Sequence, residues 1–330
     1  MAICPICQTE VNDYTEVYIS PYNQQKYKKY ECPNCDVHWW EPLKIIPKFY
    51  EEEALEGYVS RHEGLRKNLD LRHKVFFECF PKNKKGKLLD VGCGNGVFLK
   101  EAQKHGFEIW GIDFDKQSIK AAKKNLGIDT LYNMSLEEFH NFAKKKNIKF
   151  DVITFFEVLE HQDRPMEFLQ MVKDLLKDEG YIAGSVPNRE GLFRKIDWKY
   201  FHGDYPPHHF LRFSQTALYK TLELAGFKNV EIIKLDFPKE KLPLYLEKKL
   251  FGNIDKLKIW LKSKAVGNHR IAISLAVEDI DKFSCSIFIP ILKILKNLRN
   301  IILYPFTLPY WGKLKGKGRH LYFQAVNYGK

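Results

Sequence analysis

Residues 88–99 read Leu-Leu-Asp-Val-Gly-Cys-Gly-Asn-Gly-Val-Phe-Leu, which predicts a buried strand, a glycine turn and then a helix. The glycines Gly92, Gly94 and Gly96 let the chain bend sharply and bring its backbone against a ligand. Their spacing is Gly-x-Gly-x-Gly, whereas a dinucleotide fingerprint is Gly-x-Gly-x-x-Gly and seats a pyrophosphate on the helix amides. Asp90 in the strand would repel a pyrophosphate but can hold an ammonium group. The turn therefore does not fit a dinucleotide.

A second carboxylate follows the next predicted strand. Residues 108–112 form a short apolar run that is followed by Asp113, nineteen positions after Gly94. A carboxylate at this place can accept hydrogen bonds from both hydroxyls of an adenosine ribose. An ammonium group and a ribose without a diphosphate describe S-adenosylmethionine, which we expect as the cofactor.

Short apolar runs alternate with helical stretches along the middle of the chain. The runs cover residues 87–91, 108–112, 130–132, 152–156, 181–186 and 230–235, and one or two amphipathic helices are expected within 51–80. This alternation is typical of a parallel sheet with helices on both faces. The predicted fold class is α/β with a Rossmann-like sheet.

Four segments resemble, in order, the motifs of class I S-adenosylmethionine-dependent methyltransferases: residues 88–99, 111–113, 150–161 and 222–227. The resemblance covers roughly residues 60–237. It implies that Asp90 and the glycine turn hold the methionine part of the cofactor and that Asp113 holds the ribose, where many relatives have Glu. It also implies that Met134 or Ser135 is nearest the adenine and that Phe156 and Glu157 flank the methyl sulfonium. The residues expected at the cofactor are Asp90, Gly92, Cys93, Gly94, Gly96, Asp113, Phe114, Ser135, Phe156 and Glu157.

Two cysteine pairs with a two-residue spacing stand near the amino terminus. Each pair forms a knuckle that can place two thiolates at adjacent corners of a tetrahedron. The four residues Cys4, Cys7, Cys32 and Cys35 therefore predict one zinc site. The alternating run 14–19 and the turn at 21–23 suit a β-hairpin, so a zinc ribbon is expected over residues 1–45. Tyr30, Trp39 and Trp40 either pack this ribbon or form a nucleic-acid or substrate surface.

The region 238–319 holds nearly all of the excess positive charge. It contains 17 Lys or Arg and 6 Asp or Glu, in a chain whose formal net charge is +12. We expect a basic helical insertion or lid here, after a methyltransferase core over 50–237. Its apolar stretch 285–303 is interrupted by Lys and Arg, which indicates either a helix in a membrane interface or one packed on its own domain. Residues 320–330 are expected to form the last strand of the core, with 270–277 as the competing candidate.

The acceptor side is expected at residues 203–213, which follow the fifth strand at the carboxyl edge of the sheet. Because histidine titrates near neutral pH, His208 or His209 can accept a hydroxyl proton from the acceptor or can cap and pack the next helix. Glu157, Glu160 and His161 are spaced to share one helix face and form a possible divalent-ion site. This run resembles one in ubiquinone-pathway O-methyltransferases that is associated with magnesium, although most of the superfamily has its Leu-Glu-His part without a metal.

The predicted function is S-adenosylmethionine-dependent O-methylation of a saccharide, a lipid-linked molecule or another amphiphilic small molecule. A ribbon ahead of this fold resembles sugar C-methyltransferases and glycan-cluster or secondary-metabolite methyltransferases, so a sugar C-methyltransferase stays an alternative. An RNA methyltransferase that uses the ribbon and the basic region is another. Phe155-Phe156-Glu157 stands where base N-methylating enzymes carry Asn/Asp-Pro-Pro-Phe/Tyr, which argues against a nucleic-acid partner.

Composition restricts the class of protein. With 330 residues, a hydrophobic fraction of 45% and 24 Phe, the chain can fill a large core, which excludes a mostly disordered protein. Met1-Ala2-Ile3-Cys4 has neither a basic nor an apolar region of a secretory signal. We therefore expect a cytoplasmic protein, with possible contact to the inner face of a membrane through 285–303, and metal binding rather than disulfides for its seven cysteines.

Overall fold

The computed structural model describes residues 1–46, 69–200, 202–251 and 288–329. Of the helices expected within 51–80, the model contains α2 (Leu71–Cys79), and the part up to residue 68 lies outside the described residues. The competing strand 270–277 and the first residues of the stretch 285–303 also lie outside them.

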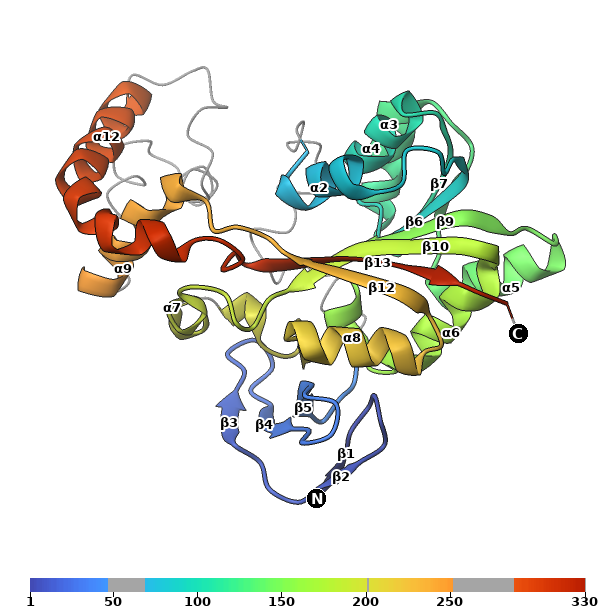
Figure 1. Cartoon of the computed structure of the whole chain (residues 1–330), viewed down its shortest axis with the longest axis horizontal. Helices are drawn as coiled ribbons and strands as arrows, with labels where there is room; N and C mark the ends of the chain where they lie inside the picture. The colour runs from blue at the N-terminus through green and yellow to red at the C-terminus, as the bar shows by residue number, and fades with distance from the viewer. Residues whose placement is uncertain (47–68, 201, 252–287, 330) are drawn as a thin grey trace.

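A seven-stranded sheet forms the centre of the molecule (Figure 1). Its spatial order is β12-β13-β10-β9-β6-β7-β8, and β8, β7, β6, β9 and β10 run parallel to one another. The strands are β6 (Gly86–Val91), β7 (Phe107–Asp113), β8 (Leu131–Asn133), β9 (Phe150–Phe156), β10 (Leu176–Pro187), β12 (Lys228–Lys234) and β13 (His320–Asn327). Every apolar run predicted as a strand overlaps one of them, so the predicted fold class is confirmed.

The strand β13 lies between β10 and β12 and runs antiparallel to both. Its register with β10 is unbroken from Gly180↔Asn327 to Pro187↔His320. The strands pack tightly here, because a Cβ at Gly184 would lie 2.0 Å from the carbonyl oxygen of Phe155 and 2.9 Å from Cζ of Phe323. The last segment of the chain thus completes the sheet beside its fifth strand.

Helices cover both faces of the sheet (Figure 1). On one face lie α2, α3 (Val97–Lys104) and α4 (Lys116–Leu126), and on the other lie α5 (Leu136–Lys145), α6 (Pro165–Leu175) and α8 (Gln215–Leu224). Neighbouring strand residues point to opposite faces. Leu88 packs in the apolar cluster of the first face, with Leu99 and Ile109, whereas Leu89 packs in that of the second.

The amino-terminal 45 residues form two small sheets below α8 (Figure 1). The first pairs β1 (Ala2–Ile3) with β2 (Glu10–Val11), and the second contains β3 (Glu16–Ile19), β4 (Lys26–Glu31) and β5 (His38–Glu41). A strand from the main domain, β11 (Leu211–Arg212), pairs with β5 and extends this sheet. Trp39 and Trp40 are fully buried, so these aromatic side chains pack the module.

The described parts of the basic region are helical. They comprise η4 (Lys239–Lys241), α9 (Leu242–Phe251), α12 (Phe288–Thr307) and η6 (Leu308–Lys313), and α12 lies at one end of the molecule (Figure 1). Leu303 and Thr307 on α12 are buried, one helical turn apart. In the part of the chain that the structure describes, no helix combines the length and the apolarity needed to cross a bilayer.

Candidate functional site

The glycine turn joins β6 to α3 at the carboxyl edge of the sheet. Gly92, Gly94 and Gly96 have φ values of 76°, 52° and 78°, which strain any residue with a Cβ. A Cβ at Gly92 would lie 2.8 Å from Cγ2 of Val158, and one at Gly96 would lie 2.8 Å from Cδ1 of Leu126. At Gly94 no described atom lies within 4 Å of that position. The middle of the turn therefore leaves room for a ligand.

Two buried carboxylates flank the turn. Asp90 is 3% exposed, and the hydroxyl of Thr154 donates to its Oδ1 at 2.7 Å. Asp113 is 8% exposed and accepts from the backbone N–H of Gly94 at 2.9 Å and of Asp115 at 2.8 Å. Asp113 thereby fixes the backbone of the glycine turn at Gly94, the position where the turn leaves room for a ligand.

Burial dominates the electrostatics of both carboxylates. It raises the pKa of Asp90 to about 8, against the hydrogen bond from Thr154 and with a further increase from the charge of Asp113. It raises the pKa of Asp113 to about 6, although the two backbone hydrogen bonds lower it. A cationic ligand beside these side chains would favour their charged forms.

The side chains of three further residues expected at the cofactor pack in the core, cap a helix or lie exposed. The Cys93 thiol is 7% exposed, and a Cβ on Gly111 would lie 2.9 Å from its sulfur, so this side chain packs in the core while its backbone follows the turn. The hydroxyl of Ser135 forms a capping box with Glu138 at the start of α5. Phe114 is 51% exposed next to Asp113.

Phe156 ends β9, and Glu157 follows it directly. The ring of Phe156 contacts those of His73 and Phe98, with centroids 4.7 and 4.8 Å apart. Glu157 has φ +58° and accepts from the Ser185 hydroxyl at 2.8 Å.

Two side chains approach the other oxygen of Glu157: the Arg72 guanidinium at 3.4 Å and the His320 imidazole, whose pKa burial lowers well below its usual range, at 3.5 Å. Burial raises the pKa of Glu157, and the charge of Arg72 opposes this. Glu157 is thus held by protein groups. It also precedes the three-residue helix η2 (Leu159–His161), so the expected shared helix face of Glu157, Glu160 and His161 was wrong.

His208 and His209 meet His161 at the same edge. The three ring centroids lie 4.5 to 4.7 Å apart, and Nδ1 of His161 donates to the carbonyl of His208 at 2.7 Å. Burial lowers the pKa of His161 to about 4 and the pKa of His209 well below its usual range. Oε1 of the fully buried Glu160 lies 3.7 Å from Nε2 of His161 and 3.9 Å from Nε2 of His209.

The sequence reasoning missed the partners that hold this site. Thr154 reaches Asp90 because β6 and β9 pair with these two residues in register, and one sequence does not specify register. Arg72 stands on α2 outside every motif. The one feature of the sequence that could have pointed to Arg72 was its position on the predicted helix before the first strand of the sheet.

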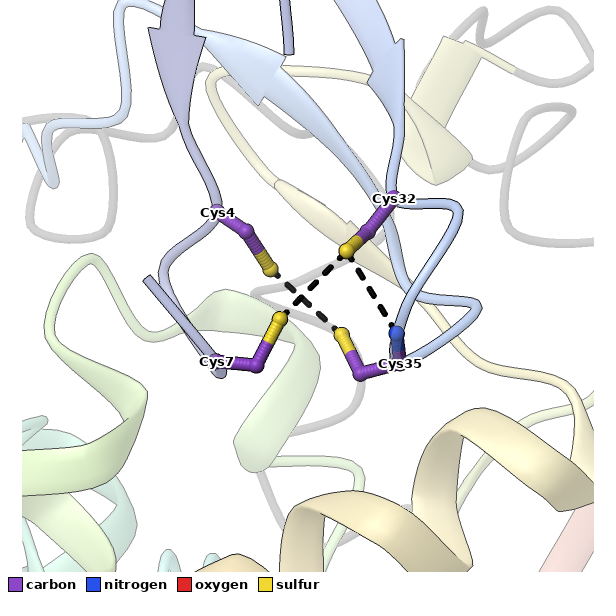
Figure 2. A group of neighbouring side chains, drawn as sticks. All are labelled: Cys4, Cys7, Cys32 and Cys35. Carbon is purple, nitrogen blue, oxygen red and sulfur yellow. Dashed lines mark hydrogen bonds between the residues drawn. The ribbon is translucent and has the colours of Figure 1, made fainter. Parts of the chain in front are cut away.

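The four cysteines of the amino-terminal module converge in space (Figure 2). Sulfur–sulfur distances are 3.4 Å between Cys4 and Cys35 and 3.4 Å between Cys7 and Cys32. The two knuckles have the same backbone turn. Gln8 and Asp36 follow them with φ values of 61° and 65°, and their amides donate to the carbonyls of Cys4 and Cys32.

A family model described as a methyltransferase domain matches residues 60–232, more than half of the chain. The chain belongs to this family. It therefore contains a class I S-adenosylmethionine-dependent methyltransferase domain, with the strand order described above.

Several curated proteins are similar to this methyltransferase domain. The mitochondrial ubiquinone biosynthesis O-methyltransferase of Schizosaccharomyces pombe is 33% identical over 132 residues, which are 39% of this chain and 47% of that protein. The ubiquinone biosynthesis O-methyltransferase of Pasteurella multocida is 37% identical over 178 residues, 51% of this chain and 66% of that protein. The chain thus spans about half the length of the first relative.

A solved structure gives a likeness of fold alone. It is phosphoethanolamine N-methyltransferase 2 of Haemonchus contortus, with a TM-score of 0.50 and 12% identity, covering 91% of this chain and 71% of that one.

The raised pKa of Asp90 predicts a pH dependence of stability. The folded carboxyl holds its proton up to about pH 8, whereas an unfolded Asp loses it near about pH 3.9. Between these values the folded state binds more protons, so this residue lowers the free energy of unfolding as pH rises, by up to about 1.4 kcal/mol per pH unit. We expect Asp90→Asn to remove this slope. The free energy of unfolding of the variant, measured with urea, should therefore rise relative to that of the wild type between pH 5 and pH 8.

The exposed Asp129 provides the control. Asp129→Asn should parallel the wild type at every pH. A constant difference between Asp90→Asn and the wild type across this range would contradict the prediction.

Proposed function

We propose that this chain transfers the methyl group of S-adenosylmethionine to a hydroxyl oxygen of a small amphiphilic molecule. The observation that carries the proposal is the pair of buried carboxylates, Asp90 and Asp113, on either side of a glycine turn with room at Gly94. Asp90 would face the ammonium group of the cofactor, and Asp113 would accept from the ribose hydroxyls. Phe156 and Glu157 would flank the methyl sulfonium.

The cofactor supplies an activated methyl group, so the protein must align the acceptor, exclude water and take up one proton. An oxygen–carbon bond forms as the carbon–sulfur bond breaks, the sulfonium becomes a neutral thioether, and the hydroxyl proton leaves. The sequence predicts His208 or His209 as its acceptor. Both imidazoles lie in the histidine cluster at the edge of the sheet, and burial lowers the pKa of His209, so that this ring is neutral at pH 7 and only a weak base.

The names of the relatives support the acceptor class. Both curated proteins are named as O-methyltransferases of ubiquinone biosynthesis, which favours a hydroxylated, amphiphilic small molecule over RNA or a sugar carbon. These names do not support the saccharide acceptor expected from the sequence, and we correct that part of the prediction. The proposed division of the chain stays at 1–45, 50–237, 238–319 and 320–330.

Asp113→Asn tests the cofactor site. The amide keeps the size of the side chain but replaces charge-assisted hydrogen bonds to the ribose, which are worth about 1.5–3 kcal/mol. We expect the affinity for S-adenosylmethionine, measured by calorimetry, to fall about ten- to a hundredfold, and Asp129→Asn to bind like the wild type. Methyl transfer to catechols and to polyprenylated phenols is followed by mass spectrometry.

Two results would contradict the proposal: no binding of the cofactor by the wild type, or methyl transfer to a nitrogen or carbon acceptor but to no hydroxyl.

We also propose that the four cysteines bind one zinc ion. Tetrahedral zinc with Zn–S bonds of about 2.3 Å holds its sulfurs about 3.8 Å apart. The distances of 3.4 Å between Cys4 and Cys35 and between Cys7 and Cys32 need only a small expansion. The matched knuckle turns support the same assignment. The ion would supply a crosslink between two loops in a module with little core of its own.

Removal of zinc by a chelator should loosen the module and the segment that pairs with it. Leu211 pairs with Trp39 and Arg212 with His38, so β11 loses its neighbour when β5 unfolds. We expect faster hydrogen exchange at residues 210–213 after chelation and unchanged exchange in β6. The metal is counted by mass spectrometry. Unchanged exchange at β11 in protein that has lost its metal would contradict the coupling.

A membrane contact through α12 is the last part of the proposal. Side chains of 288–296 lie outside the description, but Ile301, Ile302 and Phe306 are 69%, 65% and 58% exposed. Lys313, Lys315 and Lys317 are exposed and follow within ten residues of the end of α12. An exposed apolar stripe with basic flanks is typical of a helix that binds anionic lipid.

Co-sedimentation with vesicles tests this contact. We expect the wild type to sediment with anionic vesicles and the double change Ile301→Glu with Ile302→Glu to reduce the bound fraction at least tenfold, because two charges would enter the apolar layer. Leu224 is 55% exposed on α8 and supplies the control Leu224→Glu, which should bind like the wild type. Wild-type protein that stays in the supernatant would exclude the contact.

A further inference from the structure

A cluster of three histidines lies outside the cofactor turn. His161 belongs to η2, directly after β9, whereas His208 and His209 belong to the loop that leads into β11. One ring nitrogen from each lies within 4.8 Å of the other two. Nδ1 of His161 donates to the carbonyl of His208 at 2.7 Å, and its Nε2 lies 3.7 Å from Oε1 of Glu160.

The side chain of Glu160 is the unusual member of this cluster. It is 0% exposed, and among the described residues neither of its carboxyl oxygens has a hydrogen-bond partner. A buried carboxyl without hydrogen bonds is costly, and such groups are usually paired or bind a metal. Oε1 of Glu160 lies 3.7 Å from Nε2 of His161 and 3.9 Å from Nε2 of His209, so it points into the space between the rings.

We propose that His161, His208, His209 and Glu160 bind one divalent transition-metal ion. Ligand atoms bound at about 2.0–2.1 Å to one ion lie at most about 4.2 Å apart. The 3.7 and 3.9 Å distances fall within this limit, and the ring nitrogens, which all lie within 4.8 Å of one another, would come together through side-chain shifts of about an ångström. Three imidazoles and one carboxylate suit Zn²⁺, Fe²⁺ or Ni²⁺, whereas Mg²⁺ prefers oxygen ligands.

The surrounding side chains define which residues belong to the site. Oδ1 of Asp204 lies 3.4 Å from Nδ1 of His209, the place of an outer partner that orients a ligating imidazole. Glu157 is not a ligand, because Ser185, Arg72 and His320 already contact its oxygens. This set differs from the run Glu157, Glu160 and His161 that the sequence spacing indicated, and it changes the class of metal.

The site gives the acceptor side a defined chemistry. An ion here would bind a hydroxyl oxygen of the acceptor and lower its pKa, so that the nucleophile is an alkoxide or phenolate. His208 and His209 would then hold the ion instead of accepting the proton, because an imidazole nitrogen bound to a metal has no lone pair left, and the hydroxyl proton would pass to solvent water as the acceptor binds. This role rests on the proposed methyl transfer, whereas the binding of the metal does not.

Cobalt(II) reconstitution of the full chain tests the proposal, because thiolate-bound cobalt gives sulfur charge-transfer bands and a histidine–carboxylate site does not. We expect two bound ions per wild-type chain, one with these bands and one without. Glu160→Gln and His209→Gln should keep the thiolate-bound ion and bind the second at least tenfold more weakly in calorimetry. His140 lies on α5 and contacts Asp174 on α6, and it supplies the control His140→Gln, which should bind both ions.

Circular dichroism and the thiolate bands show that each variant is folded. Glu160→Gln keeps the shape of the side chain and removes a buried acid, so it serves if His209→Gln fails to fold. Binding of only the thiolate-held ion by the wild type would overturn the proposal, as would wild-type affinity for the second ion in Glu160→Gln. A second ion in a protein that transfers no methyl group would refute the proposed function and leave this site standing.

Discussion

The structure depends on burying two carboxylates at the ends of neighbouring parallel strands. Asp90 and Asp113 are shielded from water near the carboxyl ends of β6 and β7. The loss of their hydration is offset by hydrogen bonds from one hydroxyl group and two backbone amides. These neutral donors compensate only part of the desolvation, since the pKa of both side chains stays raised. The glycine turn exists in its open form because Asp113 holds the amide of Gly94. A cationic ligand would complete the compensation of these two carboxylates.

The second constraint is the link between the amino-terminal module and the histidine cluster. Phe210 connects them, since its carbonyl accepts from the amide of Trp40 at 3.1 Å and its amide donates to the carbonyl of Glu160 at 3.0 Å. The amino-terminal module is therefore attached to the methyltransferase domain by hydrogen bonds as well as by the connecting chain. It supplies a strand, β5, against which the segment after His209 is laid down, and the buried Arg212 guanidinium stacks within 5.2 Å of the Trp40 ring. The position of His208 and His209 thus depends on whether the cysteine module is folded.

The sequence predicted the fold well and the site in part, for physical reasons. Strand positions and the glycine turn follow from local patterns, because each apolar run needs burial and each glycine needs a positive φ. The cysteine knuckles were equally local, and their side chains do converge. What depends on register or on distant segments was not accessible: the Thr154 contact with Asp90 and the approach of Arg72 to Glu157. The capping box of Ser135 with Glu138 is a local Ser-x-x-Glu pattern that the sequence reasoning overlooked. The helical spacing of Glu157, Glu160 and His161 misled for a related reason, since spacing carries meaning only where a helix forms.

Burial explains why the histidine cluster is a chemical problem as well as an opportunity. Methyl transfer at this edge of the sheet, as proposed, would require the exclusion of water, and the fully buried side chain of Glu160 meets that requirement. The same burial disfavours the charged form of any acid or base at this place. Transfer of a proton from the carboxyl of Glu160 to one of the three imidazoles would create two buried charges and is therefore disfavoured. A fixed cation removes the conflict, since it satisfies the carboxylate and the ring nitrogens together and places positive charge where an acceptor oxygen must lose its proton. Among the described residues, by the same argument, no cationic side chain forms an ion pair with Asp90 or Asp113, so the glycine turn favours a ligand that carries a positive charge.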